Sequence, residues 1–172
     1  MNEREFRRKI RERCLLYGQF KLRSGKISDR YFDKYRFESE PELLREVARR
    51  MAALLPEGVQ RLAGLEMGGI PLATAVSLET GLPVMFVRKK AKEYGTKNVV
   101  EGLYHDGQKV VVIEDVLTTG TQAVNAARSL EGLGLTVLKI VCLIDREEGA
   151  REVLTAAGFA FDPLITRTMM GL

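Results

Sequence analysis

The sequence predicts an α/β protein in which a parallel sheet is flanked by helices and preceded by a small N-terminal hood. Three apolar runs, at residues 84–87, 110–113 and 137–144, have the pattern of strands that are buried on both faces of a sheet. Helical segments are expected beside these strands, which gives the order of a layered α/β domain. An aromatic-rich stretch with period-two alternation predicts an antiparallel pair, the hood, at about residues 18–38.

Length and composition favour one domain spanning residues 1–172. A hydrophobic content of 45% and a charged content of 29% are ordinary for a globular chain, and no apolar run approaches the ~20 residues that cross a bilayer. The charged N-terminus lacks a secretory signal, and Cys14 and Cys142 form no paired motif, so we expect a cytoplasmic protein without a membrane partner. The formal charge of +4 suits an anionic small molecule as well as a nucleic acid.

The first 38 residues predict a helix followed by the hood. Apolar residues recur at helical spacing over residues 3–17, which predicts an amphipathic helix. Short strands at residues 19–22 and 30–35 then form an antiparallel pair over the main sheet. Tyr31 and Phe32 belong to an aromatic group that forms either a small hydrophobic cluster or a stacking surface for a planar ring.

The next segment predicts a helix, a strand and a glycine-rich turn. Residues 39–42, Ser-Glu-Pro-Glu, have the pattern of a capping box before a helix. A strand at residues 61–64 leads into a turn at residues 64–73, whose glycines let the backbone approach a ligand closely. The spacing of these glycines matches neither a dinucleotide-binding motif nor a P-loop.

The most informative stretch is residues 109–122. An apolar strand is followed by Glu114 and Asp115, then by hydroxyls around one glycine at residues 118–121, and then by a helix at residues 122–133. The N-terminus of a helix with nearby hydroxyls suits a phosphate, whereas carboxylates suit vicinal hydroxyls or a bridging metal. A ribose that carries a 5′-phosphate meets both requirements. The alternative is that Thr118 caps the helix and the acids are solvated.

Two cationic features follow other strands. Residues 88–97 contain five cations and one acid after the strand at 84–87, and such a loop either is solvated or holds a pyrophosphate. Arg146 follows the strand at 137–144 and either pairs with Asp145 or Glu147 or faces a ligand. His105, the single histidine, has no partner at ligand spacing and receives no role.

Four motifs together resemble those of a known family. Residues 109–122 resemble the phosphoribosyl-pyrophosphate (PRPP) signature of type I phosphoribosyltransferases. The pattern F-x-L-x-S-G-x-x-S-x-x-Y-F-D at residues 20–33, R-K-x-x-K-x-[HY]-G at residues 88–95 and D-R-x-E-G at residues 145–149 resemble the orotate phosphoribosyltransferases specifically. The resemblance covers about residues 18–150 and implies the type I phosphoribosyltransferase fold. Many relatives have His at the position of Tyr94, and tyrosine cannot shuttle a proton near neutral pH.

The resemblance also implies an activity and a site. The reaction is orotate plus PRPP giving orotidine 5′-monophosphate and pyrophosphate in pyrimidine (UMP) biosynthesis, with Mg²⁺ held mainly by the substrate and no dedicated metal ligands. A homodimer is implied, in which residues 88–97 complete the neighbouring site. The implied catalytic residues are Lys92, Asp115 and Glu114. The implied PRPP contacts are Arg88, Lys89, Lys92, Tyr94, Glu114, Asp115, Val116, Leu117, Thr118, Thr119, Gly120, Thr121 and Gln122. The implied orotate contacts are Thr118, Arg146, Tyr31, Phe32 and Lys26.

Two alternatives share this fold. One is a phosphoribosyltransferase for another base, such as a purine. The other is a PRPP-sensing regulator, which would need a nucleic-acid-binding element. The first predicted helix is too short for a helix-turn-helix, and basic residues gather at the ligand loop, so we expect no nucleic-acid partner.

Overall fold

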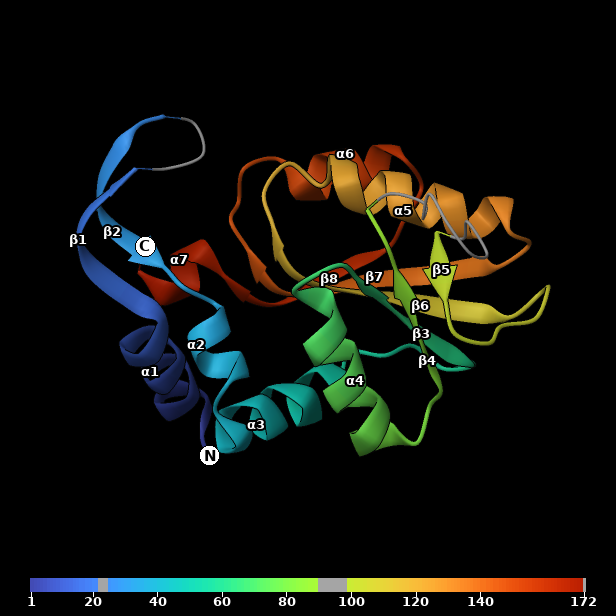
Figure 1. Ribbon diagram of the computed structural model, residues 1–172, viewed down its shortest axis with the longest axis horizontal. Coiled ribbons are helices and arrows are strands. Elements are labelled where there is room, and N and C mark those ends of the chain that lie inside the picture. Colours follow the sequence, from blue (N-terminus) through green and yellow to red (C-terminus); the bar gives the residue numbers. More distant parts are fainter. Residues whose placement is uncertain (22–24, 90–98, 172) are drawn as a thin grey trace.

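The computed structural model describes residues 1–21, 25–89 and 99–171 (Figure 1). Helix α1 (Glu3–Cys14) begins where the Asn2 side chain accepts a hydrogen bond from the backbone N–H of Glu5, and it buries Phe6, Ile10 and Cys14. The helix was predicted to continue to residue 17, which is wrong: the chain enters strand β1 (Leu15–Lys21) directly after Cys14. Strand pairing with β2 overrides the helical spacing that Tyr17 appeared to continue.

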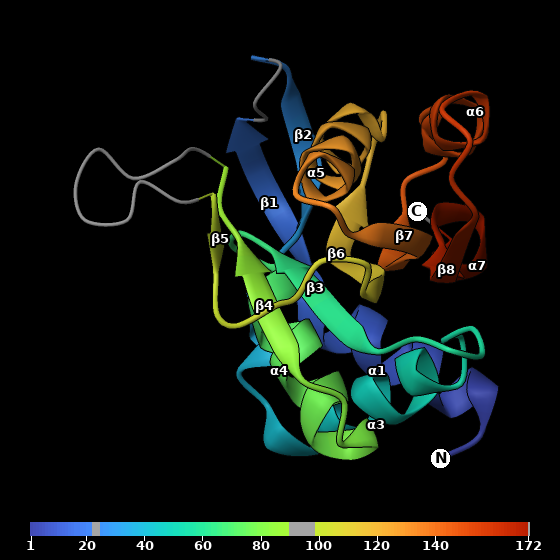
Figure 2. The same cartoon turned by 90° about the vertical axis from the view of Figure 1, so that its right-hand side faces the viewer.

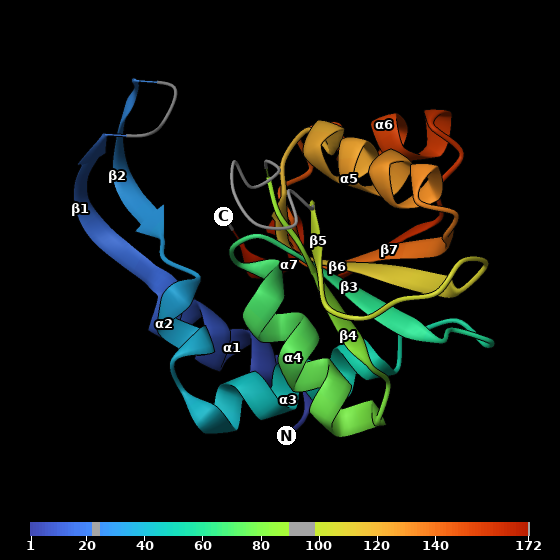
Figure 3. The same ribbon diagram turned by 45° about the vertical axis from the view of Figure 1, so that its right-hand side comes forward.

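The hood consists of β1, β2 (Ile27–Phe32) and the short helix α2 (Tyr35–Glu38). The predicted antiparallel pairing is confirmed, but the second strand ends at Phe32 and not at residue 35. The pair forms its own two-stranded sheet and extends beside the main sheet, whereas the sequence predicted packing over it (Figure 3). The exposure of Tyr17 and Ile27 agrees with this position.

Helix α3 (Pro41–Ala52) follows the hood, with Pro41 in its first turn as predicted. The predicted capping box is wrong, because Glu40 is the N-cap residue and its side chain makes no capping hydrogen bond. Ser39 instead ends α2, where its hydroxyl donates to the carbonyl oxygen of Arg36. The proline therefore marks the start of this helix, because it needs no backbone N–H there.

The main sheet confirms the predicted α/β architecture. Among the described residues its strand order is β5-β4-β3-β6-β7-β8, and the pairs are parallel except at the edge, where β5 runs antiparallel to β4. The strands are β3 (Arg61–Leu65), β4 (Val84–Val87), β5 (Val100–Glu101), β6 (Lys109–Leu117), β7 (Thr136–Asp145) and β8 (Phe161–Thr166).

Helices cover both faces of this sheet (Figure 2). Helices α1, α3 and α4 (Gly69–Thr80) lie on one side, and α5 (Thr121–Gly132) and α6 (Ala150–Ala156) lie on the other (Figures 1 and 2). The short helix α7 (Arg167–Met170) ends the described chain beside α1. No helix in the described ranges is both long and apolar enough to span a membrane.

Strand β6 lies at the centre of the sheet and contributes to both hydrophobic cores. Val111 and Ile113 pack in the core that includes residues of α3 and α4, whereas Val110 and Val112 pack in the core beneath α5. Because side chains alternate along a strand, the next two residues also face opposite sides of the sheet. This alternation decides how the site is built.

Candidate active site

Glu114 and Asp115 lie near the C-terminal end of β6, within the part of the strand that pairs with β7, which extends as far as Leu117. The Glu114 carboxylate accepts a hydrogen bond from the backbone N–H of Asp115 at 2.9 Å. The Asp115 carboxylate accepts one from the backbone N–H of Val116 at 2.6 Å. Asp115 is 3% exposed, whereas Glu114 is half-buried. The two acids are therefore adjacent and oriented by backbone donors.

The two carboxyl groups also affect each other electrostatically. Burial raises the pKa of Glu114 well above its usual range, and the neighbouring charge of Asp115 raises it further. Like charges this close disfavour double ionisation, so the pair retains a proton more readily than an isolated carboxylate does. A ligand that donates hydroxyl hydrogens or brings a cation would favour the ionised form.

A lysine from the hood forms an ion pair with one of these two acids. The Lys34 ammonium forms an ion pair with the Asp115 carboxylate, and both side chains are largely buried. Gly68, at the start of α4, lies against the same pair: a Cβ there would come within 1.4 Å of the Asp115 carboxylate. Sequence reasoning missed both Lys34 and the contact at Gly68, because nothing local in the sequence links residue 34 to residue 115.

The residues with hydroxyl side chains around Gly120, residues 118–121, form a loop, the hydroxyl loop, which lies after β6 as predicted and leads into α5. Thr118 and Thr119 are exposed, and Gly120 has a φ of 76° and serves as the N-cap residue. No side chain caps this helix, so the alternative that Thr118 is its cap is contradicted. A cavity of about 190 Å³ opens here. Its lining residues are Glu114, Val116, Leu117, Thr118, Thr119, Gly120 and Gln122. An uncapped helix N-terminus beside threonine hydroxyls is suited to an anion.

A second cavity of about 480 Å³ adjoins the first on the α5 side of the sheet, and Glu114 and Gln122 line both cavities. Arg88 and Lys89 reach it from the end of β4. The Arg88 guanidinium lies 3.9 Å from the Glu101 carboxylate, and the backbone N–H of Lys89 donates to the Glu66 carboxylate. Arg88, Lys89 and Glu114 of the predicted site thus line the same cavity.

Part of the predicted cationic loop lies outside the described residues. Lys92 and Tyr94 fall in the range 90–98, so their predicted roles remain predictions.

Arg146 lies next to the hydroxyl loop. Its backbone N–H donates to the carbonyl oxygen of Leu117 at 2.9 Å, which joins the ends of β6 and β7. Its guanidinium lies 3.5 Å from the Glu148 carboxylate. The alternative that it pairs with Asp145 or Glu147 is wrong: Asp145 accepts from the backbone N–H of Glu147, and Glu147 accepts from Thr168. An exposed pair with Glu148 leaves the arginine available to a ligand, since such pairs are weak.

The predicted hood contacts separate in the structure. Tyr31 is 45% exposed and its ring lies 5.6 Å from that of Phe20, whereas Phe32 packs against the main core. Consecutive strand residues face opposite sides, so these two rings cannot cover the same face of one ligand. Lys26 is exposed and immediately precedes β2, at the turn of the hairpin. Its contact with a base remains a prediction.

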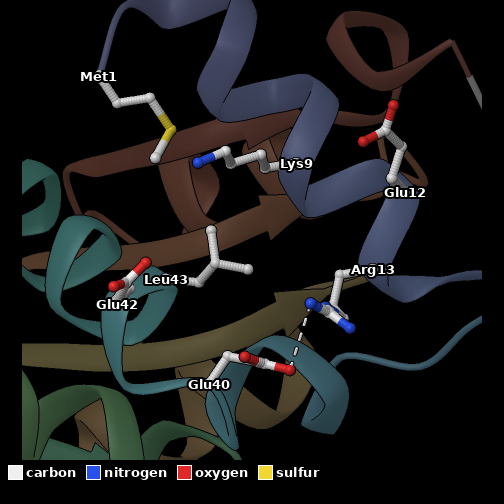
Figure 4. A pocket seen from close by; sticks show the side chains of 7 residues that line it. All are labelled: Met1, Lys9, Glu12, Arg13, Glu40, Glu42 and Leu43. Atoms are coloured by element: carbon white, nitrogen blue, oxygen red, sulfur yellow. Dashed lines mark ion pairs between the residues drawn. The ribbon is translucent and has the colours of Figure 1, made fainter.

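A third cavity, of about 370 Å³, lies between α1 and the start of α3 (Figure 4). Its charges are mixed, and Arg13 pairs with Glu40 at 3.4 Å across it. The acid pair and the hydroxyl loop do not line this cavity. We therefore assign the candidate site to the cavities beside β6, where acids, cations and a helix N-terminus meet.

Comparison with known proteins places the chain in a family. A phosphoribosyl transferase domain matches residues 36–163. The orotate phosphoribosyltransferase of Nocardioides sp. is 49% identical over 90% of this chain and 86% of its own length. The chain belongs to the orotate phosphoribosyltransferase family. The orotate phosphoribosyltransferase of Pyrococcus furiosus is 40% identical over 96% of this chain and 92% of its own length. The resemblance that the four motifs indicated is thus confirmed.

Solved structures of the orotate phosphoribosyltransferase family have the same fold. The crystal structure of Mycobacterium tuberculosis orotate phosphoribosyltransferase with Fe(III) dicitrate has a TM-score of 0.88, with 30% identity and 98% of both chains covered. The structure of the same enzyme in complex with PRPP has a TM-score of 0.83 at 27% identity, again with 98% of both chains covered. The predicted type I phosphoribosyltransferase fold is therefore confirmed.

Proposed function

We propose that the protein transfers ribose 5-phosphate from PRPP to orotate, which gives orotidine 5′-monophosphate and pyrophosphate in pyrimidine (UMP) biosynthesis. The observation that carries this proposal is the acid pair of β6 followed by the hydroxyl loop and its cavity at the start of α5. Family membership supports the reaction, and a related enzyme has been crystallised with PRPP.

The proposed roles follow from the charges that the reaction creates. Cleavage of the bond between C1 and pyrophosphate builds positive charge on the ribose and negative charge on the leaving group. Glu114 and Asp115 would accept the ribose hydroxyls beside the developing cation, and residues 118–122 would hold the 5′-phosphate. Arg88, Lys89 and Lys92 would stabilise the departing pyrophosphate. Exclusion of water from the site would prevent hydrolysis of the sugar cation.

We also propose that Mg²⁺ accompanies PRPP. Mg²⁺ keeps several waters and is usually held through one or two carboxylates together with substrate phosphates. Glu114 lines both cavities, and its pKa is raised by burial and by Asp115, so a nearby cation would favour its ionised form. When bound, the ion would neutralise pyrophosphate charge. Among the described residues no cluster of three or more metal-ligating side chains is present.

The choice of base is proposed to depend on Arg146. Orotate carries a carboxylate beside the nitrogen that attacks, and purines lack one, so a cation on the base side separates the two substrates. Arg146 lies beside the hydroxyl loop through its hydrogen bond to Leu117. A bidentate contact between a guanidinium and a carboxylate is strong and directional. Thr118, Tyr31 and Lys26 are the proposed supporting contacts.

Steady-state assays with PRPP and a panel of bases test this function. Orotate should be consumed faster than uracil, adenine, hypoxanthine or xanthine. Arg146→Ala should lower kcat/KM for orotate about tenfold to a few hundredfold, because a charged partner is lost, while PRPP affinity changes far less. Faster turnover of a purine than of orotate would contradict the proposal.

A homodimer is part of the proposal, with residues 88–97 completing the neighbouring site as the family resemblance implies. Lys92→Ala and Asp115→Asn chains, each inactive alone, should recover activity when mixed, because one hybrid site contains both intact parts. A 1:1 mixture with free exchange would reach at most about a quarter of wild-type activity. Verified subunit exchange without recovery would mean that each chain completes its own site. We further propose a cytoplasmic location, which the two free, buried cysteines support.

A further inference from the structure

The ion pair between Lys34 and Asp115 joins the hood to the candidate active site. Lys34 is the N-cap residue of α2, and its ammonium reaches the Asp115 carboxylate on β6. Gly68 at the start of α4 packs on this pair, since a Cβ there would come within 1.4 Å of the carboxylate and 2.9 Å of the ammonium. One lysine therefore contacts an acid of the signature and the turn before α4, although it belongs to neither.

The two acids of the signature have unequal surroundings. Glu114 faces the α5 side and lines both cavities beside β6. Asp115 faces the other side, where Lys34 is its cationic partner. An ionised carboxylate has about four acceptor sites, and Lys34 and the backbone N–H of Val116 occupy two of those on Asp115. Asp115 can therefore keep Lys34 and still accept a ligand hydroxyl.

We propose that Lys34 is a positioning residue for PRPP: from the hood it holds the Asp115 carboxylate in place, so that this acid can accept a ribose hydroxyl. The inference rests on the proposed function, because it assigns a task to the acid pair during PRPP binding. It also gives the hood a role beyond covering the base, since the hood supplies the counter-charge of the ribose site.

Acidic groups crowd the Asp115 carboxyl group from several elements. Glu38 of α2 has two buried carboxylate oxygens without a hydrogen-bond partner, and burial, followed by the charge of Asp115, raises its pKa to about 7. The other titratable groups around the pair are Asp33 and Tyr35 at the hood, Glu114 on β6 and Cys142 on β7. Lys34 is the cation that pairs with Asp115 among these acids, so its removal would leave the Asp115 carboxylate without its ionic partner.

The first test compares PRPP binding by calorimetry for Lys34→Met, Lys34→Arg and the matched control Arg36→Met. Arg36 is an exposed cation on the same helix, and we assign it no part in the site. Lys34→Met should bind PRPP about tenfold to a hundredfold more weakly than wild type, because the Asp115 carboxylate loses its ionic partner. Lys34→Arg should recover part of the affinity, and Arg36→Met should match wild type.

The second test asks whether Lys34 acts through Asp115. In an Asp115→Asn background, Lys34→Met should weaken PRPP binding by less than about twofold, because the carboxylate that it holds is no longer present. A loss in that background equal to the loss in the wild-type background would overturn the inference. Equal PRPP affinities for Lys34→Arg and Lys34→Met would also overturn it, because the inference requires a cation at this position. If the wild-type chain fails to bind PRPP, the proposed function itself is wrong, and this outcome is distinct from the other two.

Discussion

The carboxyl edge of the main sheet and the hood contribute to the same site in different ways. The sheet edge presents backbone-oriented acids and the loop that joins β6 to α5, and Val111, Val112 and Ile113 in β6 are fully buried. The hood hairpin is exposed along much of its length, as Tyr17 and Ile27 illustrate. The sheet edge is thus held by burial over many residues, whereas the hairpin depends on a few contacts at its base.

The base of the hood carries those contacts. Phe37 of α2 is fully buried with Phe6 of α1, and Phe32 packs against the same core. Lys34 adds the ion pair to Asp115. The hood can present exposed residues to a ligand because the contacts that anchor it are concentrated at one end. Substitutions at the sheet edge and in the hood should therefore differ in their effects on the free energy of unfolding and on substrate binding.

The largest effect is expected at the sheet edge, from Gly69→Ala. A Cβ at Gly69 would lie 2.4 Å from the carbonyl oxygen of Ile113, and neither backbone segment can move without disturbing buried strands. The free energy of unfolding should fall by about 3 kcal/mol in urea titrations. The matched control is Gly132→Ala at the end of α5, where nothing lies within 4 Å of the new Cβ. That variant should be neutral or slightly stabilising, and equal losses in both variants would contradict the assigned clash.

An intermediate effect on the free energy of unfolding is expected in the hood, where Tyr31 and Phe32 should differ. Phe32→Ala removes a ring that packs against the main core and should cost about 2 kcal/mol of unfolding free energy. Tyr31→Ala removes a ring that is 45% exposed and should cost less than about 1 kcal/mol. In the assay with orotate, Tyr31→Ala should raise KM more than Phe32→Ala does. The reverse order in stability would show that the hood is anchored through its exposed face.

The smallest effect concerns pH and the junction of the two regions. Burial raises the pKa of Glu38 from 4.5 to about 7. Between these values the unfolded chain ionises Glu38 and the folded chain does not, so folding stability falls as pH rises. Glu38→Gln removes this titration, and its stability relative to wild type should therefore improve by about 1–2 kcal/mol between pH 4.5 and pH 8, after allowance for partial exposure. Urea titrations at both pH values measure the change. If the difference in unfolding free energy between Glu38→Gln and wild type is the same at pH 4.5 and pH 8, the raised pKa is contradicted.

The sheet and the hydroxyl loop could be predicted from local sequence patterns. The apolar runs of β6 and of the second half of β7 are continuous because both faces of these strands are buried, whereas β4 buries Met85 and Val87 but only part of Val84 and Phe86. The acid pair and the hydroxyl loop follow β6 directly, so their proximity is set by a few peptide units. Chain connectivity alone thus brings together the acid pair and the hydroxyl loop of the candidate site.

The tertiary structure decided what depends on distant partners. The end of α1 and the start of β1 were mispredicted because pairing between Leu15 and Phe32 outweighs helical spacing. The partner of Arg146 is Glu148 and not Asp145 or Glu147, whose carboxylates accept hydrogen bonds from the backbone N–H of Glu147 and from Thr168. The contact of Lys34 with Asp115 joins residues that are far apart in the chain, and it forms where α2 packs on α1 and α3 and Gly68 lies against Asp115. Such contacts depend on packing in three dimensions, which local sequence patterns do not record.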